Sequence, residues 1–135
     1  MAIYGMSIML SGTIDEVKPQ VLSALKAQGF GVLTEIDVQK TMKEKLGVEY
    51  EPYLILGACN PQLANRALTA DRSIGLLLPC NVVIQQVGGE VKVSILDPEI
   101  MFSVVQPEVK NALSTLPQEA RQRLQAALDS LKQAM

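Results

Sequence analysis

The stretch from residue 53 to residue 86 constrains the fold most strongly, because it places a clear helix start between two apolar segments. Residues 53–57 are apolar on both faces, which predicts a central strand. Asn60 followed by Pro61 is typical of a helix N-terminus, since an asparagine side chain caps the first turn and a proline at the first helical position loses no hydrogen bond. The aliphatic residues 74–86 predict a second central strand, in which Pro79 forces a break or a bulge.

The N-terminal part of the chain reads as strand, helix and strand, followed by a short helix. Residues 3–10 alternate in the period of a half-buried strand, and the spacing of Thr13 and Glu16 predicts a capping box at the start of a helix. Residues 30–37 predict a second strand, with alternate residues sharing one face. Asp37 at its end is placed to cap a short helix.

The C-terminal part adds one more strand and a helical region. Gly88 and Gly89 indicate a hairpin that leads into a strand over residues 91–95. After Asp97-Pro98 the pattern becomes helical and ends in an amphipathic helix whose apolar stripe includes Leu124 and Leu128. The elements therefore follow one another as strand, helix, strand, short helix, strand, helix, strand, strand and helix.

Composition limits the classes of function. The 135 residues fit one domain spanning residues 1–135. A formal net charge of -2 and a pI near 5.1 provide no basic surface for a phosphate backbone, so nucleic acid is not an expected partner. The apolar segment at residues 1–10 is too short to span a bilayer and has no positive charge ahead of it, so no membrane association is expected. Two cysteines without a leader segment predict a reducing compartment, the cytoplasm.

The chain contains no histidine. This absence excludes the Ser-His-Asp and Cys-His nucleophilic mechanisms, histidine general-base catalysis and the commonest zinc ligand. Thiol chemistry, if there is any, must come from Cys59 and Cys80.

Cys59 and Cys80 are each followed by an asparagine, and their distance in space depends on strand direction. If the two central strands are antiparallel neighbours, the cysteines are close; if the strands run parallel, they lie at opposite ends. Cys59 also immediately precedes a helix N-terminus, which lowers a thiol pKa unless apolar burial opposes it. Such thiols would act as a nucleophile, a redox centre or ligands of a soft metal. The alternative interpretation is that both are small apolar core residues.

Two pairs of polar residues extend the candidate site. Asn60 is explained by capping, whereas Asn81 lies in an apolar strand, where a buried amide would hydrogen-bond either a loop backbone or a ligand. Glu35 and Asp37 point to the same face of their strand, so they would form a carboxylate pair for acid–base catalysis or a hard metal. The alternative is that Asp37 is a helix cap and Glu35 a surface charge.

The motifs resemble one family over nearly the whole chain. Gly57-Ala58-Cys59-Asn60-Pro61, Leu77-Leu78-Pro79-Cys80-Asn81-Val82 and Asp97-Pro98, together with Glu35-Ile36-Asp37, are similar to the signature of domain of unknown function 302. The resemblance implies an α+β fold similar to that of the TATA-box-binding protein, in which helices pack a single, mostly antiparallel sheet in β-α-β4-α order with short helices inserted. It also implies that the two central strands are antiparallel neighbours. It implies no particular reaction or cofactor.

Two hypotheses follow for the function. In the first, a site made by Cys59, Asn60, Cys80 and Asn81, flanked by Glu35 and Asp37, binds a small molecule or a soft metal or undergoes thiol redox change. The two thiols would ligate the metal, if one is bound. In the second, these residues serve the fold, and the C-terminal helix and the sheet face mediate self-association into a homodimer or another homo-oligomer.

Overall fold

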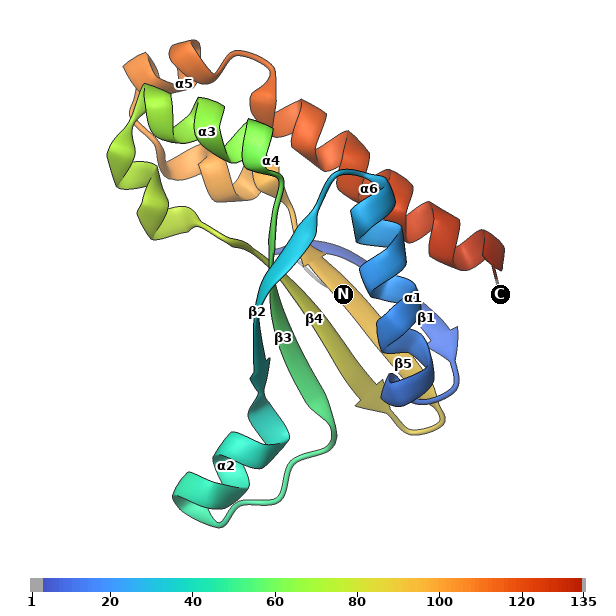
Figure 1. Ribbon diagram of the computed structural model, residues 1–135. Helices are drawn as coiled ribbons and strands as arrows, with labels where there is room; N and C mark the ends of the chain where they lie inside the picture. Colours follow the sequence, from blue (N-terminus) through green and yellow to red (C-terminus); the bar gives the residue numbers. More distant parts are fainter. Residues whose placement is uncertain (1–3, 135) are drawn as a thin grey trace.

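A computed structural model describes residues 4–134, which form one antiparallel sheet of five strands packed by helices (Figure 1). The strand order across the sheet is β1-β5-β4-β3-β2, so that β1 and β2 form its two edges. Each strand is antiparallel to its neighbours. The strands are β1 (Gly5–Ser11), β2 (Gly31–Asp37), β3 (Tyr53–Cys59), β4 (Cys80–Val87) and β5 (Glu90–Leu96).

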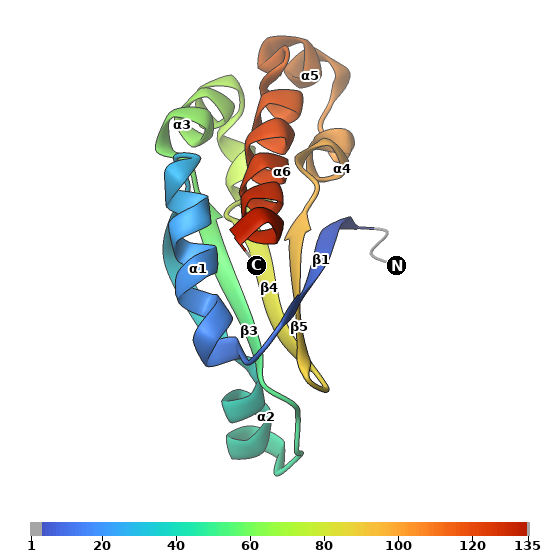
Figure 2. The same cartoon turned by 90° about the vertical axis from the view of Figure 1, so that its right-hand side faces the viewer.

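The helices cover one face and one end of this sheet. Figures 1 and 2 show α1 and α6 on the same face, α3, α4 and α5 gathered beyond one end, and α2 projecting at the opposite end. In neither view does a helix formed by residues 4–134 lie on the second face of the sheet. The helices are α1 (Ile14–Ala27), α2 (Val38–Leu46), α3 (Pro61–Ala70), α4 (Pro98–Met101), α5 (Pro107–Leu113) and α6 (Leu116–Ala134), with two 3₁₀ helices, η1 (Arg72–Leu77) and η2 (Phe102–Val104).

The core lies between the covered face of the sheet and the helices. Alternate residues of the central strands, such as Leu56, Val82 and Val93, are fully buried. Val21 of α1 and Leu124 of α6 are buried in the same cluster. The α+β fold class predicted from the sequence is confirmed, and so is the antiparallel pairing of β3 with β4.

Local signals in the sequence place most element boundaries. Thr13 accepts from the backbone N–H of Glu16, and the Glu16 side chain accepts from that of Thr13, so the predicted capping box is present. Asp37 caps α2 as expected, and Gly47 ends that helix in the left-handed conformation. The predicted first strand corresponds to β1, and residue 3 lies outside the described residues.

The predicted strand over residues 74–86 is wrong in its first part. Residues 72–77 form η1 instead, capped by the Asp71 side chain, which accepts from the backbone N–H of Ser73. Leu76 in this segment is 90% exposed, so the aliphatic run is not a buried strand. Pro79 therefore precedes β4 rather than interrupting it, and the Leu78–Pro79 peptide is cis.

The predicted alternation along residues 30–37 is interrupted by a bulge. The register against β3 shifts between Val32 and Thr34, which leaves Leu33 as the extra residue, with 69% of its surface exposed. Because side chains alternate with a period of two, the bulge moves Val32 and Thr34 to opposite faces of the sheet. These two residues were expected to share one face.

The C-terminal helix is part of the core. Leu124 and Leu128, which the second hypothesis placed at an interface, are 0% and 1% exposed. The apolar stripe of α6 already packs against the sheet and α1. Leu124 and Leu128 are therefore not available as interface residues, contrary to the second hypothesis.

Across residues 4–134, no helix combines the length and the hydropathy that crossing a bilayer requires.

Candidate functional site

Asn60 fixes the first turn of α3 at the end of β3. Its Oδ1 accepts a hydrogen bond from the backbone N–H of Leu63 at 3.1 Å, and Pro61 occupies the first helical position. The side chain is buried, and a Cβ built on Gly29 would lie 2.9 Å from Asn60 Nδ2. The turn at Gly29, where φ is +84°, therefore packs directly on the cap. The capping interpretation of Asn60 is confirmed.

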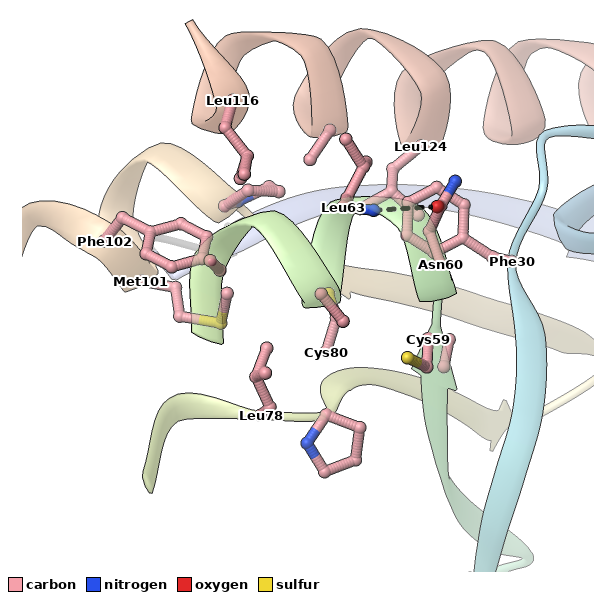
Figure 3. Close-up of a pocket in the computed structure, with 16 residues that line it drawn as sticks. Phe30, Cys59, Asn60, Leu63, Leu78, Cys80, Met101, Phe102, Leu116 and Leu124 are labelled. Carbon is pink, nitrogen blue, oxygen red and sulfur yellow. Dashed lines mark hydrogen bonds between the residues drawn. The ribbon is translucent and has the colours of Figure 1, made fainter. Parts of the chain in front are cut away.

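The two cysteines lie on adjacent antiparallel strands, offset by one residue. Ala58 of β3 is opposite Cys80 of β4, whereas Cys59 is opposite Gly31 of β2. A one-residue offset reverses the face to which a side chain points. Cys80 is buried with Ala58 on the helix side, and Cys59 is half-buried at the end of its strand. Figure 3 shows Cys59 at the start of α3 and Cys80 behind that helix.

Both thiols favour their neutral form. Burial raises the pKa of the Cys59 thiol, which is the outcome expected where apolar burial opposes the α3 N-terminus. Burial, followed by the negative charge of Asp97, raises the pKa of Cys80 from its ordinary value of 9.0 to about 12. The Cys80 Sγ donates to the backbone oxygen of Leu96 at 3.6 Å. Neither cysteine is therefore an activated thiolate.

The cysteines border the same small cavity at the end of the sheet, where α3, α4 and α6 meet (Figure 3). Among its lining residues, Asn60 and the two cysteines are the ones with polar or sulfhydryl groups in their side chains. The cavity measures about 40 Å³. It is lined by Phe30, Ala58, Cys59, Asn60, Leu63, Ala64, Ala67, Leu78, Pro79, Cys80, Pro98, Met101, Phe102, Leu116, Ala120 and Leu124.

This volume limits what the cavity can hold. A single water needs about 10–15 Å³ by this kind of measure, and a pocket that encloses a drug-sized ligand has roughly 300–1,000 Å³. The cavity therefore accepts a group of a few non-hydrogen atoms, or one end of a longer molecule.

Asn81 lies outside this cavity. It follows Cys80 directly in β4, so its side chain points to the face of the sheet that carries no helix, and it is exposed. The expectation of a buried amide is wrong, because the apolar residues on either side of Asn81 face the core while Asn81 does not. Asn81 instead lines a shallow hollow on the uncovered face, together with Tyr53, Gln85 and Lys92.

Glu35 and Asp37 are occupied by structural contacts away from the cavity. Glu35 forms an ion pair with Lys18 of α1, with 2.6 Å between Nζ and Oε1. Asp37 Oδ1 accepts from the backbone N–H of Lys40 at 2.9 Å. The cysteines lie near the Gly31 end of β2, and Asp37 ends that strand. The cap interpretation of Asp37 is confirmed, and residues 4–134 contain no cluster of three or more Cys, Asp or Glu suited to a metal ion.

Sequence reasoning missed most of the cavity wall. Leu78, Met101 and Phe102 come from a loop and from short helices, where no periodic pattern marks them as cavity residues.

Asp97 has a structural role that the sequence indicates only through the Asp97-Pro98 motif. Its Oδ1 caps α4 by accepting from the backbone N–H of Glu99 at 2.9 Å, and its Oδ2 accepts from Arg121 Nε at 3.1 Å. The Asp-Pro pair of a helix start was the available signal.

Comparison with known proteins identifies the family. The family model described as "Domain of unknown function DUF302" matches residues 6–131. The chain belongs to the DUF302 family. A crystal structure of an uncharacterized conserved DUF302 protein from Bacillus stearothermophilus is similar, with 31% sequence identity, a TM-score of 0.83, and coverage of 95% of this chain and 98% of that chain. No curated protein sequence matches the chain. Membership of the DUF302 family establishes the fold and names no activity.

Proposed function

We propose that this DUF302 domain binds a small, uncharged and mainly apolar ligand in the cavity between β3, β4, α3, α4 and α6. The observation that supports this proposal is the nearly complete apolar lining of a cavity that both cysteines border. An apolar wall penalises an ionic ligand, because a charge that leaves water there finds no partner. The two neutral thiols supply weak, polarizable contacts that suit such a ligand.

Two other thiol functions receive less support from the geometry. A soft metal held by Cys59 and Cys80 would have to displace a proton from each thiol, and the pKa of Cys80 is about 12. A redox exchange would need a thiolate, which the raised pKa of both groups disfavours near neutral pH. The hydrogen bond that Cys80 Sγ donates to the backbone oxygen of Leu96 also favours the neutral thiol.

Xenon is the probe for the ligand-binding proposal, because dry apolar cavities take up this atom. Methyl NMR spectra recorded under xenon pressure should show shifts for the Leu63, Leu78 and Leu124 methyl groups that saturate with pressure. Ala64→Leu, which fills the cavity, should abolish these shifts. Ala126→Leu is the matched control, because Ala126 is half-buried on α6 and does not line the cavity.

The outcomes separate the three functions. Saturable shifts that Ala64→Leu removes support the apolar site, and absent or non-saturable shifts at these three leucines contradict it. Cadmium ions serve as the metal probe: a thiolate-to-cadmium absorption band that requires both Cys59 and Cys80 would replace the proposal with a soft-metal site. A disulfide formed between the two cysteines in the native protein under mild oxidation would replace it with a redox function.

A further inference from the structure

Helix α2 and the segment that returns from it to β3 form an arm, residues 38–52, that stands apart from the rest of the chain. Figures 1 and 2 both show α2 beyond one end of the sheet, away from the other helices. No residue of α2 is buried. A nine-residue helix is too short to be stable in water from its own hydrogen bonds, and the main contacts of α2 are with the ends of β2 and β3, where Val38 and Met42 are half-buried.

The arm and the adjoining edge strand concentrate the exposed apolar surface of the chain. Among residues 4–134, eleven large apolar side chains are exposed, and five of them fall between residues 33 and 50. Leu46, at the end of α2, has 71% of its surface exposed. Scattered exposed apolar residues need no explanation, but Leu46, Val48 and Tyr50 fall together at the end of α2 and in the return segment, and such a group marks an interaction surface. The five are Leu33, Ile36, Leu46, Val48 and Tyr50.

The arm has internal order despite this exposure. Gln39 Nε2 donates to the backbone oxygen of Tyr50 at 2.9 Å, which ties the return segment to the helix. Asp37 and Gly47 cap the two ends of α2. The arm is thus a preformed surface rather than a loose loop, and preformed surfaces lose less entropy on binding.

The charges of the arm favour a second copy of the same chain. Helix α2 contains three lysines and one glutamate, and the return segment contains Glu49 and Glu51 without a lysine. Lys43 pairs with Glu49 within the arm, and the remaining charges leave the helix net positive, the return segment negative and the whole balanced. Two arms related by a twofold axis would each place the positive helix against the negative return segment of the other. A twofold contact requires this kind of self-complementary surface. A strongly charged partner would gain nothing from a balanced arm.

We propose that the protein forms a twofold dimer through this arm. The apolar group that includes Leu46, Val48 and Tyr50 is buried between the two copies, and Lys40 of each copy lies against Glu51 of the other. Neither Lys40 nor Glu51 forms an ion pair within the described residues, so both are free for a partner. The contact lies at the end of the sheet opposite the cavity, and it does not depend on the proposed ligand.

Sedimentation velocity over a concentration series up to about 100 μM tests the proposal. The wild-type chain should sediment as a dimer, and the double variant Leu46→Ser/Tyr50→Ser should be a monomer at every concentration. Leu76→Ser is the matched control, because it removes a leucine that is more exposed than Leu46 from η1, outside the arm. Circular dichroism confirms that each variant is folded. A monomeric wild-type chain, or a dimer that survives the arm changes, overturns the proposal.

A charge swap tests whether the partner of the arm is a second copy of the chain. Lys40→Glu and Glu51→Lys alone should each raise the dissociation constant by roughly a hundredfold, because the twofold axis repeats the contact and a typical effect for one charged contact is roughly tenfold. The two changes together should restore the wild-type value, since each reversed charge again meets its opposite on the other copy. Weakening by both single changes without recovery in the combination would contradict the twofold arrangement.

Discussion

Two helix caps in this chain have the same chemistry but different surroundings, and removing each one tests how far burial decides the cost. Asn60 and Asp37 each accept a hydrogen bond from the backbone N–H of the third residue of their helix, at 3.1 and 2.9 Å. Asn60 is buried, and α3 places Leu63 in the core, whereas Asp37 is exposed and α2 buries nothing. We expect Asn60→Ala to be much more destabilising than Asp37→Ala.

The expected magnitudes follow from the fate of the freed N–H group. Loss of an N-cap costs about 0.5–2 kcal/mol, and a buried donor left without a partner costs about 1–3 kcal/mol. Both figures describe the loss of the same hydrogen bond and are not added together. Asn60→Ala should therefore lower the free energy of unfolding by about 2 kcal/mol. In Asp37→Ala, water replaces the acceptor and α2 frays locally, so the global free energy of unfolding should fall by less than about 0.5 kcal/mol.

Urea unfolding followed by circular dichroism measures both values under identical conditions. The slope of the free energy of unfolding against urea concentration should stay the same for all variants, because the surface exposed on unfolding does not change. Asn60→Ser keeps an oxygen acceptor and should recover part of the loss. Equal losses for the two alanine variants, or a loss below about 0.5 kcal/mol for Asn60→Ala, would refute the reasoning that burial of the capped N–H sets the cost.

Three further predictions follow from the cysteines and from a packed glycine. At neutral pH iodoacetamide should label Cys59 more slowly than a free thiol and Cys80 only after unfolding; rapid labelling of Cys80 in native protein would exclude its burial. The raised pKa of Cys80 stabilises the fold below pH 9.0, and this stability should fall between pH 9.0 and about 12, by up to about 1.4 kcal/mol per pH unit. Cys80→Ala should show a shallower decline in pH-dependent urea unfolding. Gly57→Ala would push a Cβ into Thr34 Oγ1 and should cost about 1–3 kcal/mol, whereas Gly31→Ala meets no atom within 4 Å and should be nearly neutral; equal melting temperatures would contradict this packing.

Local signals account for what the sequence predicted well. The capping residues Thr13, Asp37 and Asn60 mark helix starts because each interaction closes within four residues. The antiparallel β4–β5 hairpin at Gly88-Gly89 is equally local. The pairing of β3 with β4 spans a helix, and the family resemblance rather than the residue pattern predicted it.

The errors concern burial, which depends on distant parts of the chain. Residues 76–78 are a run of leucines, yet they belong to a 3₁₀ helix and a loop because the Asp71 cap starts a turn there. The pKa of Cys59 depends on its burial at the end of the sheet, which the residues next to it in sequence do not reveal. The faces of Cys80 and Asn81 depend on the strand register, and a difference of one position reverses the assignment.

The strand order has a consequence for how the chain folds during synthesis. β1 is the first strand to be synthesised, but it pairs with β5. Gly5 therefore has no partner until Leu96 has been synthesised. The β2–β3 pair can form early, whereas closing the other edge of the sheet requires more than two thirds of the chain. Contacts this distant in sequence slow folding, because a long loop must close before any pairing energy is gained. Until then the apolar side of β1 has no partner strand, and a nascent chain shorter than 96 residues exposes it to aggregation.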